Sequence, residues 1–174
     1  PIKSPKFRVT ALSCRSTRGW LCVGPLRYRA ALGRSGRKVR KREGDGATPM
    51  GCWRILNVFY RADRLRRPQT RLPITRISPL AGWCDAPHDR NYNRQVRLPY
   101  PASAERLWRD DHLYDLVVVL DHNQRPRVRG GGSAIFLHIA REGYRPTEGC
   151  VALSAKDLVQ VVRQLRPGAQ IVFA

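Results

Sequence analysis

The chain contains 174 residues, 42% of them apolar, and carries a formal net charge of +20. This length fits one domain with a substantial hydrophobic core. Thirteen prolines and fourteen glycines favour many turns and short strands over long helices. No stretch approaches the roughly 20 apolar residues of a transmembrane helix. The basic N-terminus has no apolar segment behind it, so no secretory signal is visible: either the protein lacks a conventional signal, or this chain is a processed or trimmed form.

The positive charge is concentrated in the first half of the chain. Residues 1–80 hold 20 Lys/Arg and 3 Asp/Glu, whereas residues 81–174 hold 13 and 10. A basic half of this size attracts polyanions such as nucleic acid, or an anionic polymer that carries free carboxylates. The alternative is a general enrichment of arginine on the surface. We favour that alternative, because arginine occurs throughout the chain and not in one stripe.

The five cysteines do not form a metal-binding pattern. Their number is odd, no CxxC pair occurs, and they are Cys14, Cys22, Cys52, Cys84 and Cys150. A structural zinc site needs ligands grouped at short spacing, so we expect none. At least one thiol is free unless it pairs with another chain. Pairing among the other four stays open.

The N-terminal half is predicted to form short strands over residues 7–12, 20–23, 28–32 and 52–60, with a turn at 33–36. The basic run 34–42 is interpreted as a solvated hairpin. Residues 61–103 hold six prolines and little periodicity, which indicates a long irregular segment, either a functional substrate-side loop or a flexible insertion. Aromatic and amide groups there suit glycan or peptide binding, or simply an ordered loop, and they are Trp83, Asp85, Asp89, Asn91, Tyr92 and Asn93.

The C-terminal half has clearer patterns. Residues 105–109 suggest one helical turn, and the apolar runs 114–120 and 133–140 predict two buried strands. Ser154 begins a helix with Asp157 as a capping partner. Pro167-Gly168 ends it, and residues 169–173 form a last strand. We therefore predict a single mostly β domain over residues 1–174, a small mixed sheet or sandwich with one or two helices.

The segment His138-Ile-Ala-Arg-Glu-Gly-Tyr-Arg-Pro-Thr-Glu-Gly-Cys150 combines a histidine at a strand end with a cysteine after a loop. A neighbouring imidazole can take the thiol proton and lower its pKa, and a helix N-terminus near Cys150 would stabilise the thiolate. N–H groups around Gly149 and Cys150 could form an oxyanion hole. The alternative is a buried structural cysteine and a structural histidine.

The segments Ser133-Ala-Ile-Phe-Leu-His138 and Pro146-Thr-Glu-Gly-Cys-Val-Ala-Leu153 resemble the active-site signature of L,D-transpeptidases with the YkuD-type catalytic domain. In that family a histidine ends one strand and a Ser/Thr-x-Gly-Cys segment carries the nucleophile. Lys41-Arg-Glu-Gly-Asp-Gly-Ala-Thr-Pro-Met-Gly51 is similar to the family's Thr-Pro-x-Gly turn, in the same order. The resemblance runs from about Ala31 to the C-terminus.

The resemblance implies a cysteine acyltransferase that acts on peptidoglycan stem peptides, without metal or diffusible cofactor. Cys150 would form an acyl-enzyme, and His138 would take the thiol proton and later deprotonate the acceptor amine. Thr147 would shape the loop, and Tyr144 would be a substrate contact or a plain surface residue. The acceptor could be another stem peptide, giving a cross-link, or a D-amino acid, giving exchange. The implied compartment is the periplasm or cell envelope.

The sequence departs from the family pattern beside the nucleophile. Glu148 stands where the family often has histidine, and Leu153 where it often has asparagine or arginine. A carboxylate at position 148 could raise the thiol pKa or bind an acceptor amine. Two alternatives to transpeptidation stay open: an L,D-carboxypeptidase with water as acceptor, and a non-catalytic basic protein that binds polyanions. His112 and Tyr114 are assigned structural roles.

Overall fold

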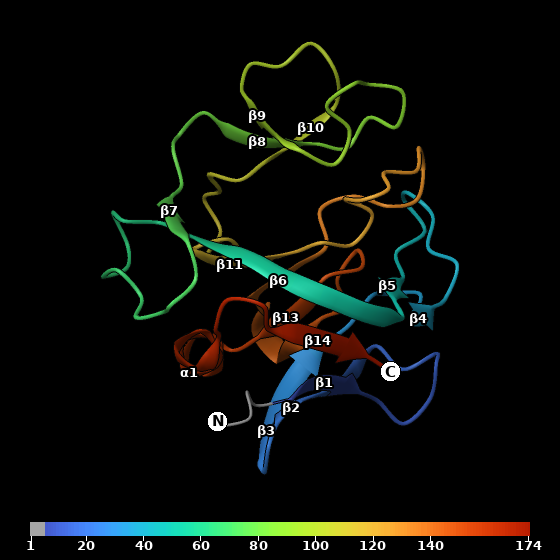
Figure 1. The fold of residues 1–174 in the computed structure, drawn as a ribbon, viewed down its shortest axis with the longest axis vertical. Coiled ribbons are helices and arrows are strands. Elements are labelled where there is room, and N and C mark those ends of the chain that lie inside the picture. The colour runs from blue at the N-terminus through green and yellow to red at the C-terminus, as the bar shows by residue number, and fades with distance from the viewer. Residues whose placement is uncertain (1–5) are drawn as a thin grey trace.

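The computed structural model describes residues 6–174 of the chain. One α-helix, one 3₁₀ turn and fourteen strands follow one another (Figure 1). Their bounds are β1 Phe7–Thr10, β2 Arg18–Val23, β3 Leu26–Ala31, β4 Arg37–Lys38, β5 Thr48–Pro49, β6 Gly51–Tyr60, β7 Ile74–Arg76, β8 Ala81–Cys84, β9 Gln95–Arg97, β10 Ala104–Arg106, β11 Leu116–Leu120, β12 Phe136–Ile139, η1 Glu142–Tyr144, β13 Val151–Leu153, α1 Ala155–Gln164 and β14 Gln170–Phe173. The predicted mostly β fold with a mixed sheet is confirmed.

The main sheet closes on itself. Its nine strands run in the order β11-β12-β13-β3-β2-β1-β14-β6-β7, and β11 also pairs with β6. Most pairs are antiparallel, but β1–β14, β12–β13 and β6–β7 are parallel. Closure is possible because β6 is long: Gly51–Arg54 pair with β14, and Ile55–Tyr60 pair with β11 along the other edge. We call this closed sheet the ring.

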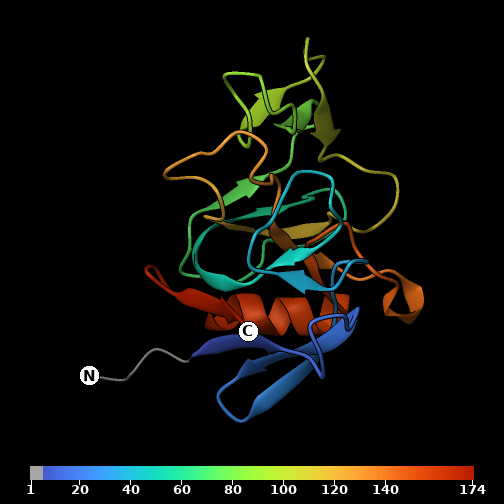
Figure 2. The same ribbon diagram turned by 90° about the vertical axis from the view of Figure 1, so that its right-hand side faces the viewer.

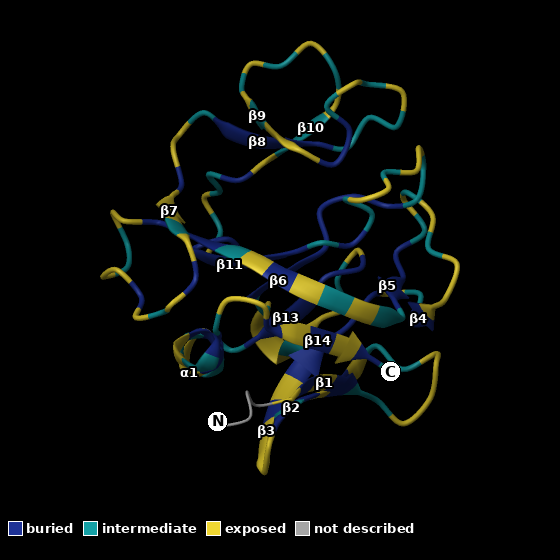
Figure 3. Ribbon diagram, viewed as in Figure 1, coloured by how far each residue is buried: buried dark blue, intermediate teal, exposed yellow. Residues whose placement is uncertain are grey.

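The helix α1 lies against the inner face of the ring, between the layer of β1–β3 and the layer of β6, β11 and β12 (Figure 2). Its apolar stripe buries Leu158, Val161 and Val162 completely, which stabilises the fold by roughly 1.5–3 kcal/mol for each side chain. The predicted cap is present, because the Asp157 N–H donates to Ser154 Oγ at 3.1 Å. Figure 3 colours each residue by its burial and shows buried residues within these layers.

The side chains of strand β11 are buried on both faces of the strand, in two different hydrophobic clusters, which explains its unbroken run of apolar residues. Leu116, Val118 and Leu120 point into the core that contains α1. Val117 and Val119 point to the opposite face, where a second cluster collects Trp83, Leu107 and Phe136. A strand buried on both faces reads as continuous hydrophobicity and not as alternation.

Residues 77–115 fold over this second face, and we call them the covering segment. The expectation of a long irregular stretch over 61–103 is only partly right, because β8, β9 and β10 form a separate three-stranded sheet at the end of the molecule away from α1 (Figure 1). The predicted helical turn at 105–109 is wrong. Ala104–Arg106 pair antiparallel with Gly82–Cys84, and this tertiary pairing overrides the local helical preference.

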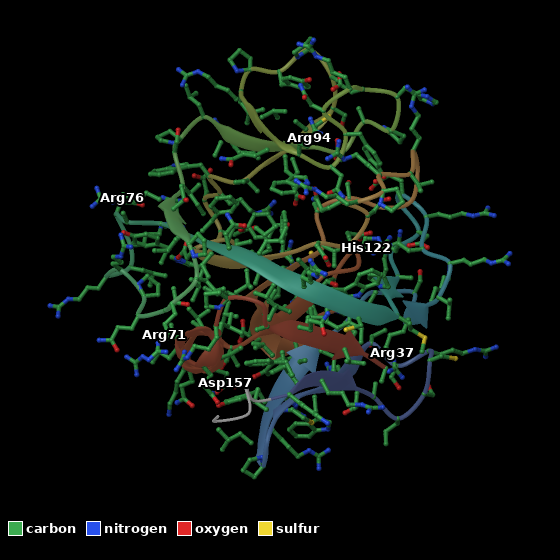
Figure 4. All side chains as sticks on the ribbon, in the orientation of Figure 1. Arg37, Arg71, Arg76, Arg94, His122 and Asp157 are labelled. Atoms are coloured by element: carbon green, nitrogen blue, oxygen red, sulfur yellow. The ribbon has the colours of Figure 1, made fainter. Side chains whose placement is uncertain are left out.

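All five cysteines lie within the described residues and none forms a disulfide; Cys84 and Cys150 are buried. In residues 6–174, no helix combines the length and apolarity required to span a membrane. Over the same residues, no three His, Cys, Asp or Glu side chains gather closely enough to hold a metal ion. In Figure 4, Arg71 and Arg76 lie on the left side of the molecule, Arg37 at the lower right and Arg94 in the upper part.

Candidate active site

Cys150 lies immediately before β13, with its side chain on the face of the ring that the covering segment covers. Its sulfur donates to the Ala134 carbonyl at 3.1 Å and accepts from the Phe136 N–H at 3.4 Å. Only 8% of the residue is exposed. These two contacts to the neighbouring strand hold the thiol in one position.

His138 lies on β12, the strand next to β13, and faces the same side. The parallel register pairs His138 with Ala152, so the side chains of residues 138, 150 and 152 share one face of the sheet. The Nδ1 atom is 2.8 Å from the Ile139 carbonyl. A carbonyl only accepts, so Nδ1 carries the proton and Nε2 is the basic nitrogen. No hydrogen bond joins this ring to the thiol within the described chain.

A cavity of about 530 Å³ opens over these two side chains. The ring, the covering segment, the loop 41–44 and the loop 141–148 all contribute to its wall. The lining residues are Lys41, Glu43, Gly44, Asp85, Glu105, Arg109, Leu113, Tyr114, Ser133, Ala134, Ile135, His138, Arg141, Arg145, Pro146, Thr147, Glu148 and Cys150. The site is therefore a pocket with charged side chains in its wall and with Cys150 and His138 at its floor.

The resting charge states of Cys150 and His138 differ from those that the sequence suggested. Burial raises the pKa of the Cys150 thiol to about 12, and the negative charge of Glu105 acts in the same direction. Burial lowers the pKa of His138 to about 4. Both groups are consequently neutral at physiological pH. The expectation that the imidazole lowers the thiol pKa in the resting state is wrong, because desolvation dominates at both groups.

The carboxylate that acts on the thiol comes from the covering segment. Glu105, on β10, accepts a hydrogen bond from the Tyr114 hydroxyl at 2.6 Å. Burial raises the pKa of Glu105 and also that of Tyr114. The Tyr114 ring in turn packs edge-on against His138, with centroids 5.2 Å apart. Tyr114 thus belongs to the pocket, although the sequence suggested a purely structural role, and Glu105 was missed because nothing in its local sequence distinguishes it.

Glu148 does not face the thiol as we expected. Its carboxylate accepts from Arg34 Nε at 2.9 Å, and 79% of its side chain is exposed. It lies at the rim of the cavity, two positions before Cys150 in the sequence, and its side chain is directed outward. The two residues flank Gly149 with opposite orientations, which the chain spacing alone could not reveal.

The loop before Cys150 is tied to two other segments. Thr147 exchanges backbone hydrogen bonds with Leu32 and Arg34, and the Gly33 N–H donates to Thr48 Oγ1 at 2.9 Å. Thr48 begins the Thr-Pro-x-Gly turn. The two motifs, 98 residues apart at Thr48 and Pro146, therefore meet through Gly33, which is why they occur together.

Thr147 and Gly149 shape the approach to the thiol. Thr147 Oγ1 donates to the Cys150 carbonyl at 2.6 Å and accepts from the Gly149 N–H at 3.1 Å. Gly149 has φ +136°, and a Cβ there would lie 2.8 Å from the Ala47 carbonyl oxygen. Because the Gly149 N–H is occupied, it is not a free oxyanion donor in this state. The Cys150 N–H has no hydrogen-bond partner among residues 6–174.

Tyr144 is not among the residues that line the cavity, which favours the alternative of a plain surface residue. The Arg29 guanidinium carbon lies 5.4 Å from the centroid of the Tyr144 ring. The helix N-terminus does not act on the thiol either. Strand β13 runs between Cys150 and α1, so the helix begins at the other end of that strand.

The aromatic and amide residues of the covering segment are mainly structural. Asn93 is 1% exposed and accepts from Trp83 Nε1 at 3.0 Å and from the Ala134 N–H at 3.1 Å. Its amide donates to the carbonyls of His122 and Asn123, each at 3.0 Å. Of the six residues singled out in the sequence, Asp85 alone is part of the cavity wall.

The chain matches the family model described as the L,D-transpeptidase catalytic domain, YkuD, over residues 22–173. It therefore belongs to the YkuD family of L,D-transpeptidase catalytic domains. A search of curated proteins found no match. A solved L,D-transpeptidase from Mycobacterium smegmatis is 14% identical, with a TM-score of 0.45 over 98% of this chain and 59% of that chain. The chain thus spans about three fifths of the length of that protein.

Proposed function

We propose that this protein is a cysteine L,D-transpeptidase that acts on peptidoglycan stem peptides through an acyl-enzyme on Cys150. The observation that carries the proposal is the grouping at the cavity floor: a positioned thiol, an imidazole whose basic nitrogen is free, and an unpaired backbone N–H at Cys150 itself. These are the nucleophile, the base and the oxyanion donor that acyl transfer requires.

The reaction starts from neutral partners. As the Cys150 sulfur attacks the carbonyl of the donor peptide, its proton passes to Nε2 of His138, and the negative carbonyl oxygen accepts from the Cys150 N–H. Collapse breaks the peptide bond; the leaving amine takes the proton from His138, and a thioester remains. An acceptor amine then loses a proton to His138 and attacks the thioester. The new amide forms, and the proton returns to the sulfur.

The pocket wall suits a zwitterionic peptide. Arg141 and Arg145 line the cavity beside His138 and have no ion-pair partner among residues 6–174, so we assign them to the carboxylates of the stem peptide. Glu105 and Asp85 of the covering segment also line the cavity, and one Asp85 oxygen is buried without a partner. We assign this acidic side to the ammonium group of the acceptor.

The wider role follows from the family. Enzymes of this type act on cell-wall peptides, so we infer a periplasmic or cell-envelope location for this chain. We also infer that the catalytic machinery lies in one domain, because the family match extends over residues 22–173. Gly149 and Thr147 then serve as loop-shaping residues, and Glu148 as part of the cavity rim.

The test is product analysis on a purified muropeptide that bears a tetrapeptide stem. Wild-type protein should release the terminal D-amino acid, give a covalent acyl-enzyme detectable by intact mass, and form dimers. Cys150→Ala should do none of these while keeping the native fold, because the change is small. Cys52→Ala, which removes an exposed thiol on β6, should retain full activity.

The products also separate the alternatives. Release of the D-amino acid without any dimer or exchange product would make water the acceptor and the protein an L,D-carboxypeptidase. Full activity in the Cys150→Ala variant would overturn the proposal.

A further inference from the structure

The outer face of strands β1, β2 and β3 carries a set of exposed arginines around one tryptophan. Inward side chains such as Phe7, Val9 and Leu21 are buried, whereas alternate residues point outward. The outward set is Arg8, Arg18, Trp20, Arg27 and Arg29. We call it the arginine face.

The strand register collects these side chains into two rows. Arg8, Cys22 and Arg27 lie side by side across the three strands, and Thr10, Trp20 and Arg29 form the next row. No acidic residue occurs in the chain before Glu43. The face therefore has positive charge that no neighbouring carboxylate on these strands neutralises.

The arginine face has a depression at Trp20. A depression of about 370 Å³ is lined by Thr10, Ala11, Leu12, Arg18, Gly19, Trp20, Arg27 and Arg29. Trp20 is 40% exposed, and the Arg27 guanidinium carbon lies 5.0 Å from its ring centroid. The Arg27 guanidinium lies over the Trp20 ring, and the exposed part of the indole can pack against the apolar face of a sugar ring while the arginines bind carboxylates.

The arginine face continues into the active-site cavity through η1. Arg18 Nη2 donates to the Gly143 carbonyl at 2.9 Å, and Arg29 lies over the Tyr144 ring. On either side of this turn, Arg141 and Arg145 line the cavity. Figure 2 shows η1 beside the open end of the β2–β3 hairpin, where β2 begins and β3 ends. These contacts place the arginine face beside the part of the cavity wall that contains Arg141 and Arg145.

We propose that the arginine face is a second binding site for the peptidoglycan polymer, which takes a sugar ring on Trp20 and the carboxylates of a neighbouring stem peptide on the arginines. The inference rests on the proposed function, since it takes the partner to be the substrate polymer. Charge complementarity and the continuity with the cavity favour this partner over an unrelated polyanion. The face would let the enzyme remain on the wall between reactions, independently of the catalytic residues.

The binding test uses the Cys150→Ala background, so that chemistry does not interfere. Purified sacculi are sedimented with the protein, and the bound fraction is measured against salt. Arg27→Ser/Arg29→Ser should weaken binding about tenfold, because two carboxylate contacts are lost. The matched control is Arg66→Ser/Arg67→Ser, which removes the same charge from the exposed β6–β7 loop. Thermal melting of both variants checks that they fold.

The activity test uses otherwise wild-type protein. Arg27→Ser/Arg29→Ser should lower turnover on sacculi about tenfold and leave kcat/KM on a soluble single-stem muropeptide unchanged. Equal losses in the two double variants would overturn the inference, as would equal losses on both substrates. Displacement of the protein from sacculi by low concentrations of DNA would also overturn it, in favour of a nucleic-acid surface. If sacculi bind through this face but no acyl transfer occurs, the proposed function fails and the surface stands.

Discussion

The ring and the covering segment are held together by different physical means. The ring strands β11 and β13 are buried at every residue and pack apolar side chains on both faces. The covering segment adds polar contacts to an apolar cluster that contains Trp83 and Leu107. Asn93 lies at the centre of these polar contacts, and Tyr100 is bound to both Asp89 and Asn91 at 2.8 Å. Apolar packing is regular and repeats along the strand, whereas a hydrogen-bond network of this kind is particular to each side chain.

The two regions supply different groups to the candidate active site. The ring supplies Cys150 and His138 and fixes their relative positions through strand register. The covering segment supplies Tyr114, whose ring packs against His138, and Glu105, which binds the Tyr114 hydroxyl and whose charge raises the pKa of the Cys150 thiol. In the proposed mechanism, the chemistry depends on groups of the ring, and the pKa of the thiol on groups of the covering segment. Three experiments test this division.

The largest effect is expected at the ring. His138→Gln should slow acyl-enzyme formation by about 10²–10⁴-fold, because a positioned general base is lost. The rate is measured by intact mass after mixing with the tetrapeptide muropeptide. His112→Gln is the matched control, since that imidazole is 76% exposed and pairs with Asp115 outside the cavity. A wild-type rate in His138→Gln would remove the histidine from the mechanism.

The next effect concerns the stability of the covering segment. Asn93→Ala should lower the free energy of unfolding by about 3 kcal/mol, because several buried hydrogen bonds lose their partner at once. Urea denaturation measures the change. Asn91→Ala, which removes one half-buried bond to Tyr100, should cost under about 1 kcal/mol. Similar values for the two variants would mean that apolar packing, and not the Asn93 network, holds this part of the molecule.

The smallest effect is expected on the pKa of the Cys150 thiol. With a thiol pKa raised to about 12, alkylation of Cys150 by iodoacetamide should keep rising with pH beyond 9, as the thiolate fraction grows. Glu105→Gln removes a nearby negative charge, lowers the pKa of Cys150, and should speed alkylation at pH 9 about threefold, equal to roughly half a pKa unit. Burial remains, so the shift is limited.

Peptide-resolved mass spectrometry gives the rate at Cys150 and uses Cys52 as an internal reference. Glu148→Gln is the control, because that carboxylate adjoins Cys150 in sequence but points outward to Arg34. If Glu148→Gln changed the rate as much as Glu105→Gln, the division between ring and covering segment would not hold at the thiol.

The sequence by itself determined most of the ring. Period-2 and continuous apolar patterns located β1, β2, β3, β6, β11 and β14, and the Ser154 cap located α1. These signals are local, since each strand or helix face must be apolar where it is buried. The sequence also singled out His138 and Cys150, because strand, loop and Gly-Cys follow one another within thirteen residues.

Only the tertiary structure decided the closure of the ring, the three-stranded sheet of the covering segment, and the environment of the thiol. Glu105 approaches Cys150 across 45 positions of sequence, while Glu148, two residues away, points to solvent. Charge and burial at the nucleophile arise from side chains that meet in space, and no local pattern encodes which carboxylate that will be.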